Sequence, residues 1–98
     1  MKNESNTQNN FPASLRMARR ARGLTQEAFD LTSSRTYISA LERGLKSPTL
    51  SKVDELAAVL GLHPLTVLAL AYVKPSSEAG VRKAIQTIEA EMLAIIFP

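Results

Sequence analysis

The sequence contains no cysteine and only one histidine, His63. Without cysteine the chain can form neither disulfides nor thiolate metal sites, and its composition suits a reducing compartment. A lone histidine with no carboxylate cluster nearby makes a poor metal or catalytic site, so we interpret His63, which precedes Pro64, as a helix-capping or packing residue. Asp54 and Glu55 are adjacent, and adjacent side chains point in different directions on a helix. With no glycine-rich phosphate loop either, the sequence predicts a protein that is not an enzyme and needs no metal or cofactor.

Long hydrophobic runs are also missing. No apolar stretch approaches the roughly 20 residues that span a bilayer, and residues 1–10 lack the apolar centre of a signal peptide. Because residues 1–10 are polar and rich in asparagine, they are predicted to form a disordered tail. The remainder of the 98 residues, in a chain that is 45% hydrophobic, suffices for one small folded domain. We therefore expect a cytoplasmic protein with no membrane partner.

The basic residues are unevenly placed along the chain. Residues 1–52 carry nine basic and four acidic side chains, whereas residues 53–98 carry three basic and five acidic ones. A basic half beside a mildly acidic half indicates that one end of the protein meets a polyanion. A solvated charged face is the alternative interpretation.

Apolar residues at helical spacing predict an all-α fold, with no competing strand pattern. Predicted helices span residues 11–22, 26–31, 35–43, 50–60, from 64 onward, and 78–96. Thr25, Ser34, Thr49 or Ser51, and Ser77 precede helices as caps, and Gly23, Gly44 and Gly61 follow helices where they end. The predicted core comprises Phe11, Leu15, Ala18, Ala28, Phe29, Leu31, Ile38, Leu41, Val53, Leu56, Ala57, Leu60, Leu65, Leu68, Leu70 and Tyr72.

The second and third predicted helices, joined through Thr32-Ser33-Ser34, have the outline of a helix-turn-helix. In this motif the second helix enters the major groove, and its N-terminal residues contact base edges. Arg35 can donate two hydrogen bonds to guanine, Thr36 and Ser39 can bond several bases, and Ala40 can touch a thymine methyl. Helix 35–43 therefore has the side chains that reading duplex DNA requires.

The segments GLTQE, YISALERG, a proline a few residues later, and LAAVLG occur in that order. Residues 11–72 thereby resemble the lambda-repressor-like, Cro/XRE-type helix-turn-helix family of bacterial and phage regulators. The resemblance implies a five-helix DNA-binding domain at residues 11–73. It also implies a dimeric, nucleoid-associated transcriptional regulator that binds double-stranded DNA at a near-palindromic operator, as a repressor for which control of its own gene is one option.

The resemblance also implies roles for individual residues. Gln26 matches a glutamine that contacts a phosphate, and Arg19 and Glu42 match a buried ion pair that joins the first and third helices. Arg43 and Lys46 match positions near the DNA backbone, with plain solvated charge as the alternative. The predicted base-reading residues are Ser34, Arg35, Thr36, Ser39 and Ala40, and the predicted backbone contacts are Thr25, Gln26, Tyr37, Arg43 and Lys46.

The sequence departs from the family pattern at the turn. The segment from Gln26 to Tyr37 is two residues shorter than is usual in the family, and no glycine occupies the turn. Either the helix at 26–31 loses part of a turn, or the loop runs tightly through Thr32 and Ser33. The docking angle on DNA depends on which of these occurs.

Residues 76–98 are predicted to form a C-terminal helix that serves as a dimerisation element. Its apolar residues recur in steps of four and three, which is the pattern of a coiled coil or a packed helix pair. The stripe either packs back onto the first and fifth helices or pairs with a second chain, and its apolar end favours the second arrangement. The predicted dimer interface comprises Val81, Ile85, Ile88, Met92, Ile95, Ile96 and Phe97.

The alternative to a DNA-binding regulator is a protein-interaction module, or an antitoxin-like partner-binding protein, that keeps the fold.

Overall fold

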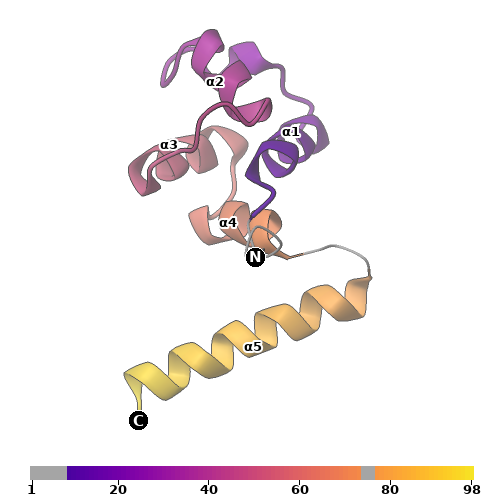
Figure 1. Cartoon of the computed structure of the whole chain (residues 1–98), viewed down its shortest axis with the longest axis vertical. Coiled ribbons are helices and arrows are strands. Elements are labelled where there is room, and N and C mark those ends of the chain that lie inside the picture. The colour runs from indigo at the N-terminus through magenta and orange to yellow at the C-terminus, as the bar shows by residue number, and fades with distance from the viewer. Residues whose placement is uncertain (1–8, 74–76) are drawn as a thin grey trace, which may run out of the picture.

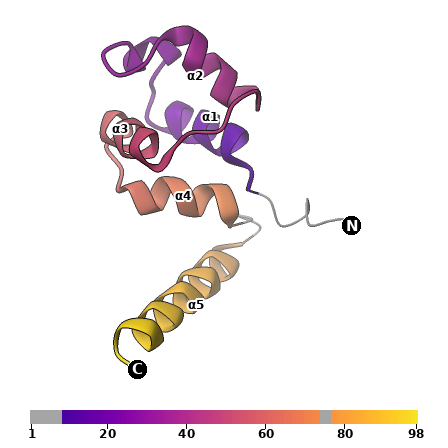
Figure 2. The same ribbon diagram turned by 60° about the vertical axis from the view of Figure 1, so that its left-hand side comes forward.

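The computed structural model describes residues 9–73 and 77–98. Over these ranges the chain forms five α-helices, one 3₁₀ helix and no strand, which confirms the all-α prediction. The helices α1 to α4 and η2 surround one core, and α5 lies apart from them beyond α4, in both views (Figures 1 and 2). The elements are α1 (Phe11–Ala21), η2 (Gln26–Phe29), α2 (Arg35–Glu42), α3 (Leu50–Leu60), α4 (Pro64–Tyr72) and α5 (Glu78–Ile96).

Most helices begin at a side chain that accepts a hydrogen bond from the backbone of the first turn. The hydroxyls of Ser34, Thr49 and Ser77 do so as predicted. His63 Nδ1 accepts from the Leu65 amide at 3.0 Å, so the lone histidine caps α4. Such caps satisfy amides that have no partner within the helix. Thr25 precedes η2 in extended conformation but makes no side-chain cap.

The core is formed by the inward faces of the first four α-helices and η2. Leu15, Phe29, Ile38, Leu41 and Leu56 have the largest fully buried side chains. α1 packs on both α2 and α4, and α3 packs on α4 and η2. This arrangement holds α2 against the body along one side and leaves its other side exposed.

Four residues predicted to lie in the core do not. Leu31 is fully exposed, and Ala28 is also exposed, because η2 ends at Phe29 and buries that residue alone. Leu65 and Tyr72 are exposed because α4 instead turns Val67 and Ala71, one helical turn apart, toward the core. Apolar composition in these short helices thus did not specify which face is inward.

The N-terminal end of the domain is tied to α4. The Asn10 amide donates to the Ala71 carbonyl at 2.7 Å, and the buried Ser14 hydroxyl donates to the Leu70 carbonyl at 2.7 Å. Asn10, the last residue of the predicted tail, is therefore hydrogen-bonded to α4. Residues 1–8 of the predicted tail and residues 74–76, between the last two predicted helices, lie outside the described residues.

Across the two described ranges, no single helix is both long and apolar enough to cross a membrane. α3 and α4 reach the required length and hydropathy only when taken together, and they meet at an angle of 105°. Both helices bury apolar residues in the core of the domain.

Candidate nucleic-acid interface

α2 presents one continuous exposed face. Arg35, Ser39 and Arg43 recur at four-residue spacing and Thr36 lies beside them, so the four side chains share one side of the helix. Arg35, Thr36 and Arg43 are exposed and Ser39 is partly so. We call these four residues the α2 face. Its donors and its short central side chains match the requirements for contacting base edges in the major groove.

Ala40 does not belong to the α2 face. It is only 6% exposed, so the prediction that it points outward is wrong. The chain reverses at Gly44, whose φ of 76° is left-handed, and the Leu45 amide donates to the Ala40 carbonyl at 2.9 Å. The Ala40 methyl group is thus not available to a base.

Three residues of the α2 face, Arg35, Ser39 and Arg43, make contacts within the protein. Arg35 forms an ion pair with Glu27 of η2, in which the side chains are 57% and 61% exposed. Arg43 Nε donates to the Ser39 hydroxyl at 3.2 Å. Exposed pairs of this kind contribute about 0–1 kcal/mol, so a phosphate or a base can displace them at little cost.

A bidentate ion pair joins α1 to α2. Arg19 Nε and one terminal nitrogen donate to the two Glu42 carboxylate oxygens at 2.7 and 2.9 Å. The two side chains are 11% and 3% exposed. Arg19 also donates to the Leu24 carbonyl at 3.0 Å. The pair therefore fixes the end of α2 and the chain entering η2 to the same helix.

Gln26 completes this network from η2. Its side-chain amide donates to Glu42 at 3.2 Å, so part of the predicted phosphate-contacting group faces the interior. Burial raises the pKa of Glu42, but hydrogen bonds from Arg19 and Gln26 and the nearby Arg charges outweigh it, and the net pKa lies below the ordinary value. The hydrogen bond to Glu42 raises the pKa of Arg19. Both groups are thus held in their charged forms.

The shortened turn is accommodated by η2. A 3₁₀ helix winds more tightly than an α-helix, and η2 ends after four residues. The amides of Thr32 and Ser33 and the Thr32 hydroxyl all donate to the Phe29 carbonyl, at 2.8 to 3.1 Å. Every non-glycine residue of the described ranges has negative φ, which explains why this turn needs no glycine.

Lys52 of α3 holds the same turn from outside. Its Nζ donates to the Thr32 carbonyl at 3.2 Å and to the Ser33 hydroxyl at 2.9 Å. It also pairs with Glu55 at 2.8 Å. Sequence reasoning missed Lys52 as a site residue, counting it only in the basic half, because nothing in the local pattern links it to a turn about 20 residues earlier.

Two lysines, Lys46 and Lys52, lie near the aromatic ring of Tyr37. Lys52 Nζ is 5.4 Å and Lys46 Nζ is 6.0 Å from the centre of the Tyr37 ring, distances at which a cation is attracted to the ring face. Tyr37 and Lys46, both predicted backbone contacts, are thus brought together beside the α2 face. Thr25 is exposed at the start of η2.

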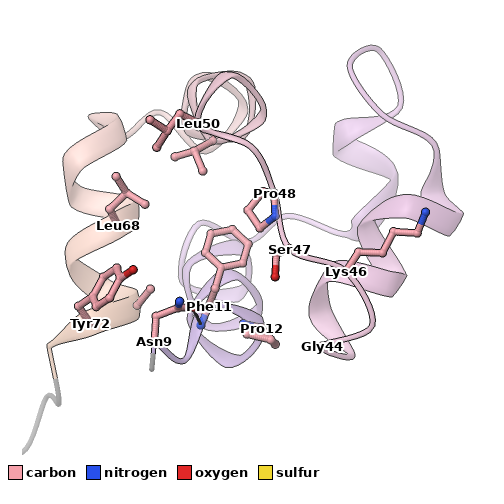
Figure 3. Close-up of a pocket in the computed structure, with 12 residues that line it drawn as sticks. Asn9, Phe11, Pro12, Gly44, Lys46, Ser47, Pro48, Leu50, Leu68 and Tyr72 are labelled. Carbon is pink, nitrogen blue, oxygen red and sulfur yellow. Dashed lines mark hydrogen bonds between the residues drawn. The ribbon is translucent and has the colours of Figure 1, made fainter. Parts of the chain in front are cut away.

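An open pocket of about 560 Å³ lies between the start of α1, the loop after α2, and α4 (Figure 3). Phe11, Leu68 and Tyr72 contribute apolar surface, and Lys46 is the one charged residue among those lining it. The lining therefore supplies no acid–base pair. Elsewhere in the described ranges, no three His, Asp or Glu side chains gather closely enough to hold a metal ion.

The predicted interface residues of the C-terminal helix are all exposed. None of the 19 residues of α5 is buried. The stripe of Val81, Ile85, Ile88, Met92 and Ile95 is 38% to 79% exposed, and Ile96 and Phe97 extend the apolar surface to the C-terminus. The stripe does not pack back onto α1 and α4 in this structure.

Comparison with known proteins agrees with this geometry. A family model described as helix-turn-helix matches residues 15–67. Over 46 residues the chain is 48% identical to the "Uncharacterized HTH-type transcriptional regulator y4dJ" of Sinorhizobium fredii, a match that covers 45% of this chain and 60% of that relative. The match thus spans less than two thirds of the curated relative. The chain belongs to the lambda-repressor-like, Cro/XRE-type helix-turn-helix family of DNA-binding transcriptional regulators.

Proposed function

We propose that this protein binds a near-palindromic operator in duplex DNA as a homodimer and represses transcription, including that of its own gene. The observation that carries the proposal is the α2 face: an exposed set of side chains of the types that contact bases, on a capped helix that is fixed to the core. DNA at the nucleoid would be the working location, and no catalytic step is involved.

On DNA, the N-terminal end of α2 would enter the major groove. Arg35 would leave Glu27 and donate to guanine, while Thr36 and Ser39 would bond neighbouring bases. Ser34 would stay committed to its cap, since its hydroxyl accepts from the Tyr37 amide. The remaining predicted backbone contacts (Thr25, Gln26, Tyr37, Arg43 and Lys46) and Lys52 would border the groove and position the protein on phosphates.

A dimer follows from the small reach of one recognition helix. One helix covers too few base pairs to be specific, whereas two helices on half-sites about 34 Å apart read a longer site with two-fold symmetry. The uncovered stripe on α5 provides a surface for such pairing.

The test is a titration of the upstream DNA of its own gene and of random DNA of equal length, read by fluorescence anisotropy at several salt concentrations. We expect selective binding that weakens steeply with salt, because phosphate contacts release counterions. Arg35→Ala is expected to cost about 1–3 kcal/mol and to relax preference at one base pair. Lys83→Ala, which removes one positive charge from α5, is the control and should leave that preference unchanged.

A second candidate, a protein-interaction module, is favoured by the same uncovered face of α5. It predicts a salt-insensitive complex with another protein and no DNA affinity above that for random sequence. Equal, weak binding of both DNAs, together with an Arg35→Ala variant that behaves as the parent, would support this candidate over the repressor.

A further inference from the structure

The α5 stripe is an apolar face that the rest of the described chain leaves uncovered. Its five residues follow d and a positions of a heptad, with Val81, Ile88 and Ile95 at d, and Ile85 and Met92 at a. An apolar surface of this extent on a small protein marks a contact with another molecule.

The charges of α5 are separated along its length. Arg82 and Lys83 lie in the first half, which begins with Glu78, and Glu89 and Glu91 lie in the second half. Arg82 forms only a long, exposed contact with Glu78, at 3.5 Å. Arg82 and Glu89 both occupy e positions, on the same flank of the stripe. A flank that carries Arg82 toward one end and Glu89 toward the other is complementary to its own reverse.

We propose that the stripe binds α5 of a second copy in antiparallel orientation. This proposal rests on the proposed homodimer and specifies its geometry. Val81 would lie opposite the partner's Met92, and Ile85 opposite the partner's Ile88. The two-fold axis then runs perpendicular to the two helices, so that each of these two contacts occurs twice.

Only the antiparallel direction pairs the opposite charges. In antiparallel pairs, e positions face e positions, so Arg82 would lie beside the partner's Glu89, and the symmetric contact repeats it. In a parallel pair, e positions face g positions, which here are Ala84 and Glu91. That arrangement would place Glu89 against the partner's Ala84 and would form no ion pair. Antiparallel helix dipoles add a further favourable contribution.

The antiparallel arrangement also separates the two DNA-binding bodies. With 19 residues, α5 is about 28 Å long at 1.5 Å per residue. Bodies attached at opposite ends of such a pair would be held apart by somewhat less than one helical turn of DNA, about 34 Å. The geometry of α5 thus agrees with recognition of two half-sites on one face of the duplex.

Because the chain lacks cysteine, disulfide trapping can read the direction of the pair. Val81→Cys and Met92→Cys proteins, one carrying a size tag, are mixed and oxidised, and the products are separated on a denaturing gel. We expect the mixed 81–92 disulfide to predominate at least tenfold over either 81–81 or 92–92. Predominant 81–81 and 92–92 products would show a parallel pair, and a monomer with no cross-link would show that the stripe does not pair at all. Either result overturns the proposal.

A charge swap provides the second measurement, on proteins that keep the apolar stripe intact. Arg82→Glu should weaken the dimer about tenfold, since it removes two surface pairs and creates two repulsions, each near 0.2–1 kcal/mol. Adding Glu89→Arg should restore the affinity, whereas Lys83→Glu, on the other side of α5, should change it little. No rescue by the double variant would overturn the register. Operator binding, measured on the same proteins by anisotropy, tests the proposed function separately, because a parallel dimer that still reads its operator would refute only the antiparallel geometry.

Discussion

The ion pair between Arg19 and Glu42 should be the polar contact on which the helix-turn-helix most depends. Replacing Arg19 by methionine removes the cation and leaves a carboxylate whose side chain is 3% exposed. Among the residues that the structure describes, Gln26 alone still donates a hydrogen bond to that carboxylate, at 3.2 Å. Breaking a buried pair in this way costs about 3–5 kcal/mol. Since small domains have a free energy of unfolding of about 5–15 kcal/mol, Arg19→Met should consume a large part of it.

The double variant separates the pair from its burial cost. Arg19→Met with Glu42→Leu removes both charges together, and apolar replacement of a buried pair is often close to neutral. We expect the double variant to lose about 1 kcal/mol, mainly the hydrogen bonds to Leu24 and Gln26. The free energy of unfolding is measured by urea denaturation followed by far-ultraviolet circular dichroism at pH 7.

The result that refutes this reasoning is additivity. If Arg19→Met and Glu42→Leu each cost less than about 1 kcal/mol, or if their costs simply sum in the double variant, then Arg19 and Glu42 do not act as one buried unit. In that case the position of α2 would be set by apolar packing alone.

Three further predictions concern the same region. Because the folded pKa of Glu42 lies below that of the unfolded chain, the stabilisation is complete above the unfolded value of about 4.3 and is lost as the pH falls through the folded value. Lowering the pH from 5 to 3 should therefore reduce the free energy of unfolding, measured by urea denaturation, more for the parent than for the double variant. Lys52→Met should lower the free energy of unfolding by about 1 kcal/mol and weaken operator binding. Lys52→Arg, which keeps the charge, should retain part of the stability and part of the affinity. If Lys52→Met changed neither quantity, the turn would be stable without Lys52. Glu27→Gln should tighten operator binding up to about fivefold, because it frees Arg35 from an exposed pair, and anisotropy showing weaker binding would contradict this.

Local signals were sufficient to predict the helices. Ser34, Thr49 and Ser77 accept backbone hydrogen bonds at the predicted starts, and Gly61 adopts the left-handed conformation that ends α3. Each of these features depends on a few consecutive residues, whose preferences are readable without knowing the fold. The same holds for the spacing that placed Arg35 and Ser39 on one exposed side of α2.

Predictions failed where distant parts of the chain decide burial. Ala40 is buried although it directly follows Ser39 of the α2 face, and Leu65 is exposed because Val67 meets the core instead. Leu31 continued a helical pattern that the structure ends at Phe29. In helices of four to nine residues an apolar stripe has too few members to fix its phase, so tertiary contacts choose the inward face.

Lys52 shows how a departure from the family pattern and its compensation can be far apart in sequence. The turn after Phe29 is two residues short, yet it needs neither a glycine nor a left-handed residue, because its donors converge on one carbonyl and a lysine of α3 binds its outer side. The same lysine lies against Tyr37, in the first turn of α2. A single side chain therefore links the turn, the recognition helix and α3, and the angle at which α2 meets DNA should depend on it more than on any residue within the turn itself.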